Sequence, residues 1–286
     1  MQKKKKVVIA GAGQTGRWAA RMLNPAGAEL VAFCDNDPDK QKHDIDGIPV
    51  QSPKQALQSS PDYVLAAVSD AERRQEIIDS VRQAGYRGRI MPLDEIRQLL
   101  DLRSWVFVQV MRQIAEEKVP GDLAELGVYL GDTAEVINRT MPGRRLYLFD
   151  TFRGFDRRDI YTELRGDFSE AKKGEFSDTS IQQVRERMPH LDKVIIRPGY
   201  FPQTAEGLED NTYCFVHLDA DLYEPTLAGL KYFYPRVSRG GVLFLHDYYS
   251  DQYRGVRKAV ETYRSQCDRL VLIPVGDFHG SCMIVK

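Results

Sequence analysis

The sequence predicts an α/β protein built from two Rossmann-like doubly wound domains in tandem. At 286 residues the chain is too long for one ordinary α/β domain and long enough for two. Short apolar runs alternate with stretches of helical period along most of its length. Two of those runs, residues 7–10 and 123–126, each lead into a glycine-containing loop and then a helical stretch. We therefore expect domains at residues 1–95 and 120–286, joined by a helical linker at residues 96–119.

The composition is that of an ordinary globular protein and argues against several functional classes. Hydrophobic residues make up 42% and charged residues 28%, and the net charge is −1, so we expect neither a nucleic-acid partner nor a membrane partner. The chain contains no apolar run as long as a membrane span, and its start lacks the cleavage region of a secretory signal. No Cys-x-x-Cys pair occurs, and we expect four reduced core cysteines in a cytoplasmic protein: Cys34, Cys214, Cys267 and Cys282.

The first domain begins as a nucleotide-binding βαβ unit would. The apolar run at residues 7–10 ends in the turn Gly-Ala-Gly-Gln-Thr-Gly. A helix is expected next at residues 17–23, and a second strand at residues 29–34 then leads into an acidic turn. Glycines let such a turn approach a pyrophosphate at the helix N-terminus, and an acid about 20 residues further on can bond ribose hydroxyls. The residues that would do this are Gly11, Gly13, Gly16 and Asp35.

The rest of this domain leaves two interpretations of the glycine turn. Strands are expected at residues 63–68 and 89–92, with a helix between them at residues 71–84. No tyrosine–lysine pair or other recognisable redox group accompanies them. The turn is thus either a site for a nicotinamide dinucleotide, NAD(P), or part of a structural or regulatory scaffold. Residues 6–95, including Gly-Ile-Pro-Val at 47–50, resemble the nucleotide-binding domains at the front of bacterial polysaccharide-biosynthesis proteins.

The linker is expected to form one helix, from Asp94 to about Glu117, which ends before Pro120 and Gly121. Apolar residues recur along it at the spacing of a single buried face: Ile96, Leu99, Leu100, Trp105, Val108 and Met111. A helix with such a face would pack as a bridge between the two domains.

The second domain repeats the alternation but ends differently. Five strands are expected, at residues 123–126, 146–149, 193–197, 213–218 and 241–245. Asp132 is expected to cap a helix that runs to Met141. Two further strands, at residues 269–275 and 281–285, are joined by a turn so short that they can pair only in antiparallel fashion. Five parallel strands followed by a terminal hairpin are typical of a class I methyltransferase sheet.

Ligands of an open parallel sheet bind beyond the carboxyl ends of its strands, so the residues there are candidates for a site. The loop after the first strand suits S-adenosylmethionine, because its glycines allow close approach but lack the three-glycine pattern for a pyrophosphate, which this cofactor does not contain. Asp150, after the second strand, can accept hydrogen bonds from both ribose hydroxyls. The predicted cofactor-binding residues are Glu125, Gly127, Tyr129, Gly131, Asp150 and Thr151.

A second polar group follows the fourth and fifth strands and suits metal-assisted transfer to a hydroxyl. Asp219, His246 and Asp247 end neighbouring strands and could share one divalent ion, Mg²⁺ or Mn²⁺. Asp221 lies two residues beyond Asp219, on the same face of an extended chain, and is the candidate base. An alkyl hydroxyl has a pKa of about 15.7 and an aspartate about 3.9, so full deprotonation by a lone carboxylate costs about 16 kcal/mol. A metal ion removes much of that cost, and proton loss during methyl attack can avoid the rest.

Each of these residues also has a structural interpretation. Asp221 could cap the helix that begins near Pro225, and His246 could be a packing histidine or a base that acts near neutral pH. His217 lies in mid-strand, and we expect it in the core rather than among the ligands. Each acid alone is a weak signal, so the prediction depends on four polar residues at two adjacent strand ends.

Three segments of the second domain carry a family resemblance. They are Gly-Asp-Leu-Ala-Glu-Leu-Gly-Val-Tyr at 121–129, Leu-Phe-Asp-Thr-Phe-Arg-Gly-Phe at 148–155, and Leu-Asp-Ala-Asp-Leu-Tyr-Glu-Pro-Thr at 218–226. Together with the run at 233–248, they resemble the macrocin O-methyltransferase family over residues 120–286. The resemblance implies methyl transfer from S-adenosylmethionine to a sugar hydroxyl of an antibiotic-type glycoside, with magnesium.

The resemblance also assigns roles to individual residues. It implies Asp219 and Asp247 as metal ligands, Asp221 as the general base and Asp150 as the ribose-binding acid, with Gly127 and Gly131 in the cofactor loop. One position departs from the family pattern: the antibiotic enzymes have two adjacent acids after the fifth strand, where this chain has His246-Asp247. Histidine is a poor ligand for magnesium and a better one for manganese or zinc, so the identity of the metal, and even its presence, stay open.

The main prediction is therefore an O-methyltransferase of a sugar-containing small molecule: a glycoside, a nucleotide sugar or a polysaccharide precursor. A charged insertion at residues 153–174 is expected to help build the acceptor pocket and to form a mobile lid over it. Two other functions stay open. A nicotinamide-dependent nucleotide-sugar enzyme would depend on Gly13, and a non-catalytic nucleotide sensor would keep its function when Asp221 becomes Asn. The acceptor and the oligomeric state, a homo-oligomer included, are not fixed by the sequence.

Overall fold

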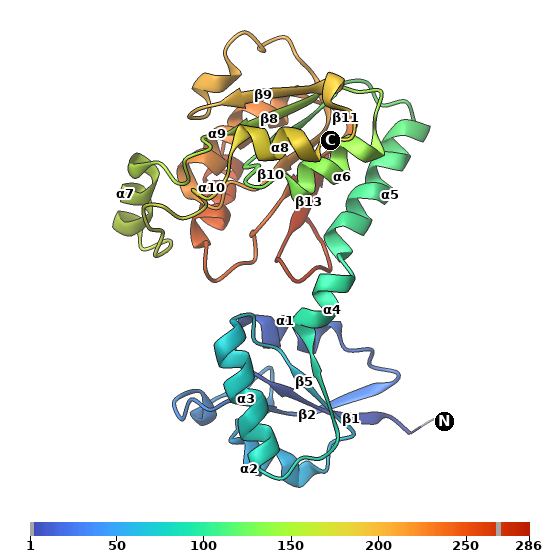
Figure 1. Cartoon of the computed structure of the whole chain (residues 1–286), viewed down its shortest axis with the longest axis vertical. Coiled ribbons are helices and arrows are strands. Elements are labelled where there is room, and N and C mark those ends of the chain that lie inside the picture. The colour runs from blue at the N-terminus through green and yellow to red at the C-terminus, as the bar shows by residue number, and fades with distance from the viewer. Residues whose placement is uncertain (1–2, 267–269) are drawn as a thin grey trace. The chain divides into compact units, whose positions relative to one another are not determined.

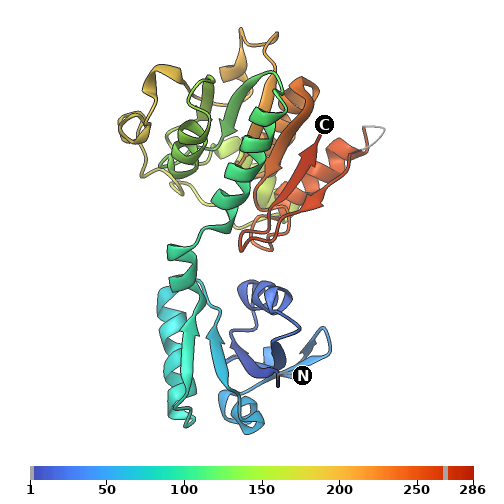
Figure 2. The ribbon, with the colours of Figure 1, turned by 90° about the vertical axis from the view of Figure 1, so that its right-hand side faces the viewer.

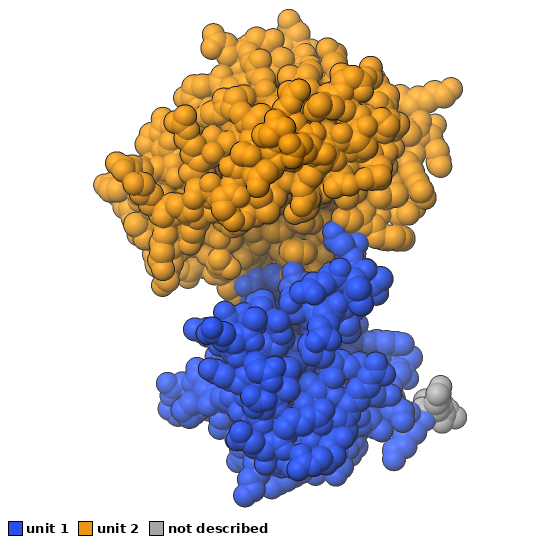
Figure 3. Space-filling model, in the orientation of Figure 1, with its two compact units in different colours: residues 1–101 blue, residues 102–286 orange. Residues whose placement is uncertain are grey.

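The fold is that of a computed structural model, which describes residues 3–266 and 270–286. The chain divides into two compact units, residues 1–101 and residues 102–286 (Figures 1 and 3). The division falls inside the segment that the sequence assigns to a linker, residues 96–119. Cys267 and the predicted start of a strand at Arg269 lie outside the described residues.

Unit 1 contains a six-stranded sheet in the order β3-β4-β2-β1-β5-β6, in which every neighbouring pair is parallel except β3 with β4. Its strands are β1 (Lys5–Ala10), β2 (Ala28–Cys34), β3 (Asp44–Ile45), β4 (Ile48–Gln51), β5 (Tyr63–Ala66) and β6 (Arg89–Pro92). Its helices are α1 (Gln14–Met22), α2 (Pro53–Ala56), α3 (Ala71–Gln83) and α4 (Leu93–Leu99), and two short 3-10 turns lie at Lys40–Lys42 and Leu57–Ser59.

Helices cover both faces of this sheet. Successive residues of β1 point to opposite faces, and Val8, Ile9 and Ala10 are all buried, so both faces need a covering layer. Val8 and Ala10 pack in one core with residues of α2 and α3. Ile9 points to the other face, where it lies 3.5 Å from the place that a Cβ on Gly16 of α1 would take. The doubly wound fold predicted for the first domain is therefore confirmed.

Unit 2 contains a seven-stranded sheet in the order β12-β13-β11-β10-β7-β8-β9. Its strands are β7 (Asp122–Leu126), β8 (Leu146–Asp150), β9 (Val194–Pro198), β10 (Tyr213–Leu218), β11 (Val237–Leu245), β12 (Ile273–Pro274) and β13 (Cys282–Val285). The first five are parallel, and β13 lies antiparallel between β11 and β12. The predicted five parallel strands and terminal hairpin are confirmed.

Two helical layers enclose the sheet of unit 2 (Figures 1 and 2). One core packs the sheet against α9 (Tyr223–Arg236) and α10 (Arg254–Arg264). The other packs it against α5 (Leu102–Glu116), α6 (Asp132–Thr140) and α8 (Ile181–Arg187). A further helix, α7 (Arg157–Gly166), lies in the insertion after β8. Because both faces are covered, the open edge formed by the strand ends is the place left for a ligand.

The prediction of one linker helix with one buried face is wrong. The chain leaves the helix at Leu100, which is extended, so α4 and α5 are separate helices. Four residues of the predicted face are exposed to solvent: Ile96, Leu99, Leu100 and Trp105. The face of α5 that is buried in unit 2 consists of Phe107, Met111 and Ile114. Apolar residues occur on more than one side of this segment, so periodicity alone selected the wrong side.

Smaller details differ as well. The N-cap of α6 is Gly131, in a left-handed conformation, and Asp132 lies in the first turn, where it pairs with Arg187 instead of capping. Cys34, Cys214 and Cys282 are free and buried, as expected. Within the described part of the chain, no helix is long and apolar enough to cross a membrane.

Candidate active site

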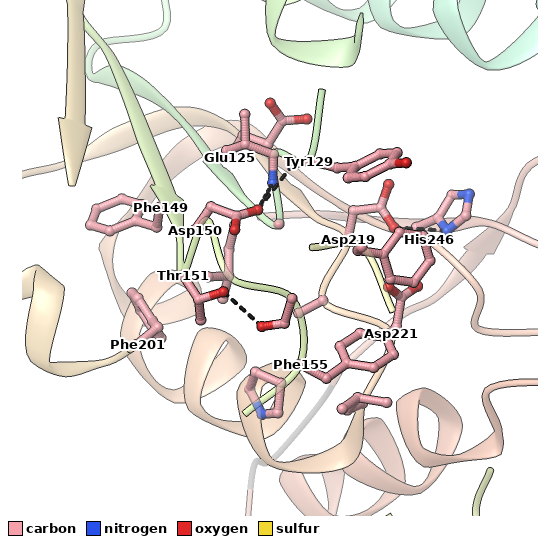
Figure 4. A pocket seen from close by; sticks show the side chains of 18 of the residues that line it. Glu125, Tyr129, Phe149, Asp150, Thr151, Phe155, Phe201, Asp219, Asp221 and His246 are labelled. Carbon is pink, nitrogen blue, oxygen red and sulfur yellow. Dashed lines mark hydrogen bonds and ion pairs between the residues drawn. The ribbon is translucent and has the colours of Figure 1, made fainter. Parts of the chain in front are cut away.

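A cavity of about 470 Å³ lies beyond the carboxyl ends of β7, β8, β10 and β11 (Figure 4). The loops that follow these four strands line it, and so do residues of the insertion after β8 and of the terminal hairpin turn. This is the edge of the sheet where the predicted site residues were expected to meet. With the exception of Gly131, every residue predicted to act in unit 2 lines the cavity: Glu125, Gly127, Tyr129, Asp150, Thr151, Asp219, Asp221, His246 and Asp247.

The loop after β7 is held in shape by the carboxylate of Asp150. Oδ2 of Asp150 accepts hydrogen bonds from the backbone N–H groups of Val128, at 2.7 Å, and of Tyr129, at 3.0 Å. Oδ1 accepts one from the N–H of Phe152 at 2.7 Å. A carboxylate has about four lone-pair sites, so Asp150 can hold this loop and still accept from a ligand in the cavity.

Left-handed backbone conformations explain the glycines of this loop. Gly127 has φ +87° and Gly131 φ +84°, in the region that side-chain-bearing residues rarely adopt. A Cβ on Gly127 would lie only 1.8 Å from the carbonyl oxygen of Asp219, so the loop after β7 packs directly on the backbone after β10. Gly131 does not line the cavity, and its part is to start α6.

The side chains of Thr151 and Tyr129 stabilise the walls of the cavity. The Thr151 hydroxyl donates to the carbonyl of Gly154 at 2.7 Å and closes the turn after β8. The Tyr129 hydroxyl bonds to the carboxylate of Asp178 at 2.9 Å, and this bond raises the pKa of the tyrosine. Their polar side-chain groups therefore have partners inside the protein.

Glu125 occupies a different position from the one expected of a residue after the strand. It lies within β7, is 1% exposed, and its Oε1 is 2.9 Å from Nδ1 of the fully buried His217. Burial raises the pKa of Glu125 well above its usual value and lowers the pKa of His217 to about 3, so burial favours the neutral form of both side chains. The expectation that His217 belongs to the core agrees with this burial. Glu125 reaches the cavity only as part of its floor.

Four side chains at the ends of β10 and β11 form a compact cluster. Asp219, Asp221, His246 and Asp247 each offer an atom that can bind a metal, and these atoms all lie within 4.8 Å of one another. Nδ1 of His246 is 2.9 Å from Oδ1 of Asp219 and 2.9 Å from Oδ2 of Asp247. Figure 4 shows Asp219, Asp221 and His246 turned toward one another. The juxtaposition predicted from the two strand ends is thus present.

The backbone carries strain at this cluster. Asp221 has φ +56° and Asp247 φ +55°, conformations that cost of order 1–3 kcal/mol for residues other than glycine. Such strain persists where the surrounding structure imposes it, and it collects at functional sites. Asp221 is also not the cap of the following helix, because the N-cap of α9 is Leu222.

The charges of the cluster shift one another's protonation. Burial alone would lower the pKa of His246, but the carboxylates of Asp219 and Asp247 outweigh it and raise the pKa well above its usual value. Burial would likewise raise the pKa of Asp219, and the charge of His246 instead holds it below the ordinary range. For Asp221, burial and the neighbouring charges of Asp219 and Asp247 act together and raise its pKa.

Two residues that the sequence did not reveal complete the cluster. Arg103, at the start of α5, places Nη1 3.5 Å from Oδ2 of Asp219, although 116 positions separate them in the chain. His279, in the terminal hairpin turn, lines the cavity with its ring centroid 5.1 Å from that of His246. Asp277 shapes that turn by accepting from the N–H groups of His279 and Ser281. The sequence spacing of Arg103 and His279 from the acids of the cluster does not indicate that they lie close to it.

The insertion after β8 is anchored to the rest of unit 2. Glu163 of α7 is fully buried and accepts from the Ser169 hydroxyl at 2.6 Å and from the N–H of Tyr223 at 2.7 Å. Asp159 of the same helix lines the cavity and accepts from the Tyr200 hydroxyl at 2.7 Å, while burial raises its pKa to about 6. The predicted lid is thus fastened to α9 and to the segment after β9.

Unit 1 has a second cavity, of about 520 Å³, at the glycine turn after β1. Gly11, Gly13 and Asp35 line it, whereas Gly16 does not: a Cβ there would lie 1.9 Å from the carbonyl oxygen of Gly11, so this glycine allows α1 to pack on the turn. Asp35 accepts from the N–H of Ala12 at 2.8 Å and from Nζ of Lys40 at 3.1 Å. The acid after β2 thus holds the glycine loop of unit 1 much as Asp150 holds that of unit 2.

Comparison with known proteins decides the family. Residues 97–280, more than half of the chain, match the family described as Macrocin-O-methyltransferase (TylF). The chain belongs to the macrocin-O-methyltransferase family. Residues 6–81 match the PglD N-terminal domain, which supports the separate resemblance noted for the first domain.

Individual relatives agree with this assignment. An 8-demethyl-8-(2,3-dimethoxy-alpha-L-rhamnosyl)-tetracenomycin-C 4'-O-methyltransferase of Streptomyces olivaceus is 30% identical over 180 residues, 59% of this chain and 66% of that protein. A demethyldecarbamoylnovobiocin O-methyltransferase of Streptomyces niveus is 28% identical over 172 residues, 56% of this chain and 64% of that protein. The chain therefore spans 64–66% of the length of these two curated relatives.

Solved structures show the same fold. The O-methyltransferase NovP superposes with a TM-score of 0.53 at 25% identity, covering 65% of this chain and 79% of that chain. CalS11, a calicheamicin methyltransferase, superposes with a TM-score of 0.55 at 18% identity, covering 87% of this chain and 93% of that chain. At that identity the second comparison concerns the fold alone, and it supports the class I methyltransferase sheet predicted for unit 2.

Proposed function

We propose that unit 2 is an S-adenosylmethionine-dependent O-methyltransferase that acts on a hydroxyl of a sugar-containing small molecule. One observation carries the proposal: the loop held by Asp150 and the cluster around Asp219 line the same cavity. A methyl donor bound at the loop and an acceptor hydroxyl bound at the cluster would lie next to each other. Holding two reactants in line is the main requirement of this displacement.

The relatives support both the reaction and the acceptor class. The relatives from S. olivaceus and S. niveus and the solved protein NovP are all named O-methyltransferases. The first of them is named for a rhamnosyl group on its substrate. We therefore propose a glycoside, a nucleotide sugar or a polysaccharide precursor as the acceptor.

The donor site would consist of the loop after β7 and the acid after β8. In this proposal the glycine loop lets the backbone approach the methionine part of the donor, and Asp150 accepts from a ribose hydroxyl with the lone-pair site that the three backbone N–H groups leave unused. Thr151 and Tyr129 form the walls, and Glu125 belongs to the floor.

The cluster fits a divalent cation. It brings carboxylate oxygens and one imidazole nitrogen to within 4.8 Å of one another. A bound cation would offset the mutual repulsion of these carboxylates. A second sign is His217, fully buried, whose Nε2 has no hydrogen-bond partner among the described residues and lies 3.8 Å from Oδ2 of Asp219. When bound by Asp219, Asp247 and His246, such an ion would polarise the acceptor oxygen and make its proton easier to lose.

Asp221 would take that proton, because its carboxylate belongs to the cluster and lines the cavity. A positioned general base contributes a factor of about 10²–10⁴ to the rate. His246 is the alternative base if the site works without a metal.

The experiment is a turnover assay with labelled S-adenosylmethionine and a panel of sugar glycosides and nucleotide sugars, with and without divalent ions. Asp221→Asn should lower kcat by about 10²–10⁴ while the affinity for S-adenosylhomocysteine changes little. Asp192→Asn, a change at an exposed acid, is the matched control. Failure of the purified protein to bind S-adenosylmethionine in calorimetry would end the proposal.

For unit 1 we propose a second nucleotide site at the glycine turn, with NAD(P) as the first ligand to test. The cavity beside Gly11, Gly13 and Asp35 supports it. Binding of NADH is followed by fluorescence. A signal that is the same for the native chain and for Gly13→Asp would leave unit 1 as a scaffold, and turnover of a nucleotide sugar with NAD(P) would instead favour a nicotinamide-dependent enzyme.

A further inference from the structure

The cluster of Asp219, Asp221, His246 and Asp247 contains one nitrogen donor, the imidazole of His246. The distances around this nitrogen bear on how it would bind an ion. Nδ1 of His246 is 2.9 Å from one oxygen of Asp219 and 2.9 Å from one oxygen of Asp247. Adjacent ligands on an octahedral ion, with bonds of about 2.1 Å, lie about 3.0 Å apart, because the edge of an octahedron is √2 times the bond length. The two N–O distances are thus compatible with adjacent positions on one ion, and they are also within hydrogen-bond range.

The ring of His246 is held so that Nδ1, and not Nε2, faces the acids. Its other nitrogen, Nε2, is buried and has no hydrogen-bond partner within residues 3–266 and 270–286. The ring packs at 5.1 Å from the ring of His279 and at 6.4 Å, edge-on, from that of His217. Only 13% of the side chain is exposed. Packing on both sides limits rotation of the ring, so the nitrogen near the carboxylates is a fixed feature of the site.

We propose that His246 makes this cation site selective for manganese-class ions over magnesium. Magnesium is a hard ion that prefers oxygen ligands, whereas imidazole nitrogen suits first-row transition-metal ions, whose affinity for a site of this kind rises from Mn²⁺ through Fe²⁺ and Co²⁺ to Ni²⁺. The inference deepens the proposed function, because it concerns the same site, but metal binding can be measured without turnover. An all-oxygen site would need an acid at position 246, which a single substitution provides.

The experiment compares divalent ions on the full chain by calorimetry, with Mn²⁺ and Mg²⁺ titrated separately into metal-free protein. We expect Mn²⁺ to bind at least about a hundredfold more tightly than Mg²⁺, and His246→Asp to reduce that ratio by at least about tenfold, which is about 1.4 kcal/mol. His43→Asp, at an exposed histidine of unit 1, is the matched control and should leave the ratio unchanged. An equal ratio in the native chain and in His246→Asp would overturn the proposal, and so would a native chain that binds neither ion.

A spectroscopic measurement on the native chain keeps the proposal testable even if His246→Asp does not fold. Pulsed electron paramagnetic resonance of bound Mn²⁺ should detect a directly bound nitrogen, and loss of that signal in His246→Asp would identify the ligand. A Mn²⁺ spectrum without a nitrogen ligand in the native chain contradicts the inference. Binding of S-adenosylhomocysteine is measured in the same preparations. A lack of binding would count against the proposed function, while the metal preference would be judged by the metal titrations alone.

Discussion

Gly127 and Asp219 are in direct backbone contact: a Cβ on the glycine would lie 1.8 Å from the carbonyl oxygen of the aspartate. The ladder between β7 and β10 continues into this contact, since the N–H of Asp219 donates to the carbonyl of Leu126 at 2.8 Å. The loop proposed to bind the methyl donor and the strand end proposed to bind the cation are therefore packed directly against each other. A change in either backbone moves the other.

This contact predicts that Gly127→Ala will damage both proposed sites together. The new methyl group cannot fit, and φ +87° is strained for alanine, so the loop and Asp219 must separate. We expect the affinities for S-adenosylhomocysteine and for Mn²⁺ each to fall by about tenfold or more, as measured by calorimetry. Gly143→Ala is the control, because a Cβ there meets no other described atom within 4 Å and φ is ordinary. Loss of one affinity with full retention of the other would contradict the prediction.

Asp150→Asn should weaken donor binding and the fold around it. The carboxylate accepts three backbone N–H groups, and an amide must turn its NH₂ toward at least one of them. Leaving one buried donor unsatisfied costs about 1–3 kcal/mol of the free energy of unfolding. Urea denaturation and titration with S-adenosylhomocysteine measure the two effects, with Asp210→Asn at an exposed loop as control. Unchanged stability would show that the amide reproduces the carboxylate's bonds.

Asp159 predicts a specific dependence of stability on pH. Burial raises its pKa to about 6 in the folded protein, against an ordinary value of 3.8, so the folded protein holds this proton more tightly than the unfolded chain. The stability that the proton contributes is complete below pH 3.8 and is lost as the pH rises through about 6. Asp159→Asn removes this dependence, and we expect it to stabilise the protein at pH 7.5 by about 1–2 kcal/mol, a value discounted for partial solvent screening.

The test is urea denaturation of the native chain and of Asp159→Asn at pH 7.5 and pH 5.0. The difference in free energy of unfolding should shrink at the lower pH, because the native carboxyl is then largely protonated. Asn can still accept from the Tyr200 hydroxyl, so this bond is kept. A difference that is equal at both pH values would mean that the folded-state pKa of Asp159 is ordinary.

Two glycines of unit 1 should respond differently to the same substitution. Gly16→Ala brings a methyl group to 1.9 Å from the carbonyl of Gly11, and overpacking of this kind costs about 1–3 kcal/mol. Gly13→Ala meets no described atom within 4 Å and should leave stability within about 0.5 kcal/mol. Hydrogen exchange of the peptides from β1 and α1 reports on unit 1 in the full chain. Faster amide hydrogen exchange in Gly13→Ala than in Gly16→Ala would contradict this prediction.

Most of the site residues that could be predicted from sequence share one property: they lie at or just beyond the end of an apolar strand. Asp150, Asp219 and Asp247 lie at strand ends, and parallel strands bring their ends to one edge, so their meeting follows from the fold class. The alternation of strands and helices also predicts the terminal hairpin, because a short turn between two strands allows only antiparallel pairing.

Residues that reach the cavity from elsewhere could not be predicted in this way. Arg103 comes from a helix whose buried face the periodicity does not identify, and its approach to Asp219 depends on how α5 packs on the sheet. His279 depends on where β13 inserts into the sheet. Glu125 differs for another reason: the sequence pattern groups it with the residues after the strand, while its burial opposite His217 holds it in the core.

The insertion of β13 between β11 and β12 has a consequence for the order in which the protein is assembled. The turn that carries His279 reaches His246 only after β13 has paired with β11, which joins segments far apart in the sequence. β13 follows the other strands of this sheet along the chain, so it is the last of them to become available during synthesis. In a newly made chain the loop after β7 could therefore form while the cluster beside it still lacks the wall that His279 provides. Such a chain could hold the proposed methyl donor before it could transfer the methyl group.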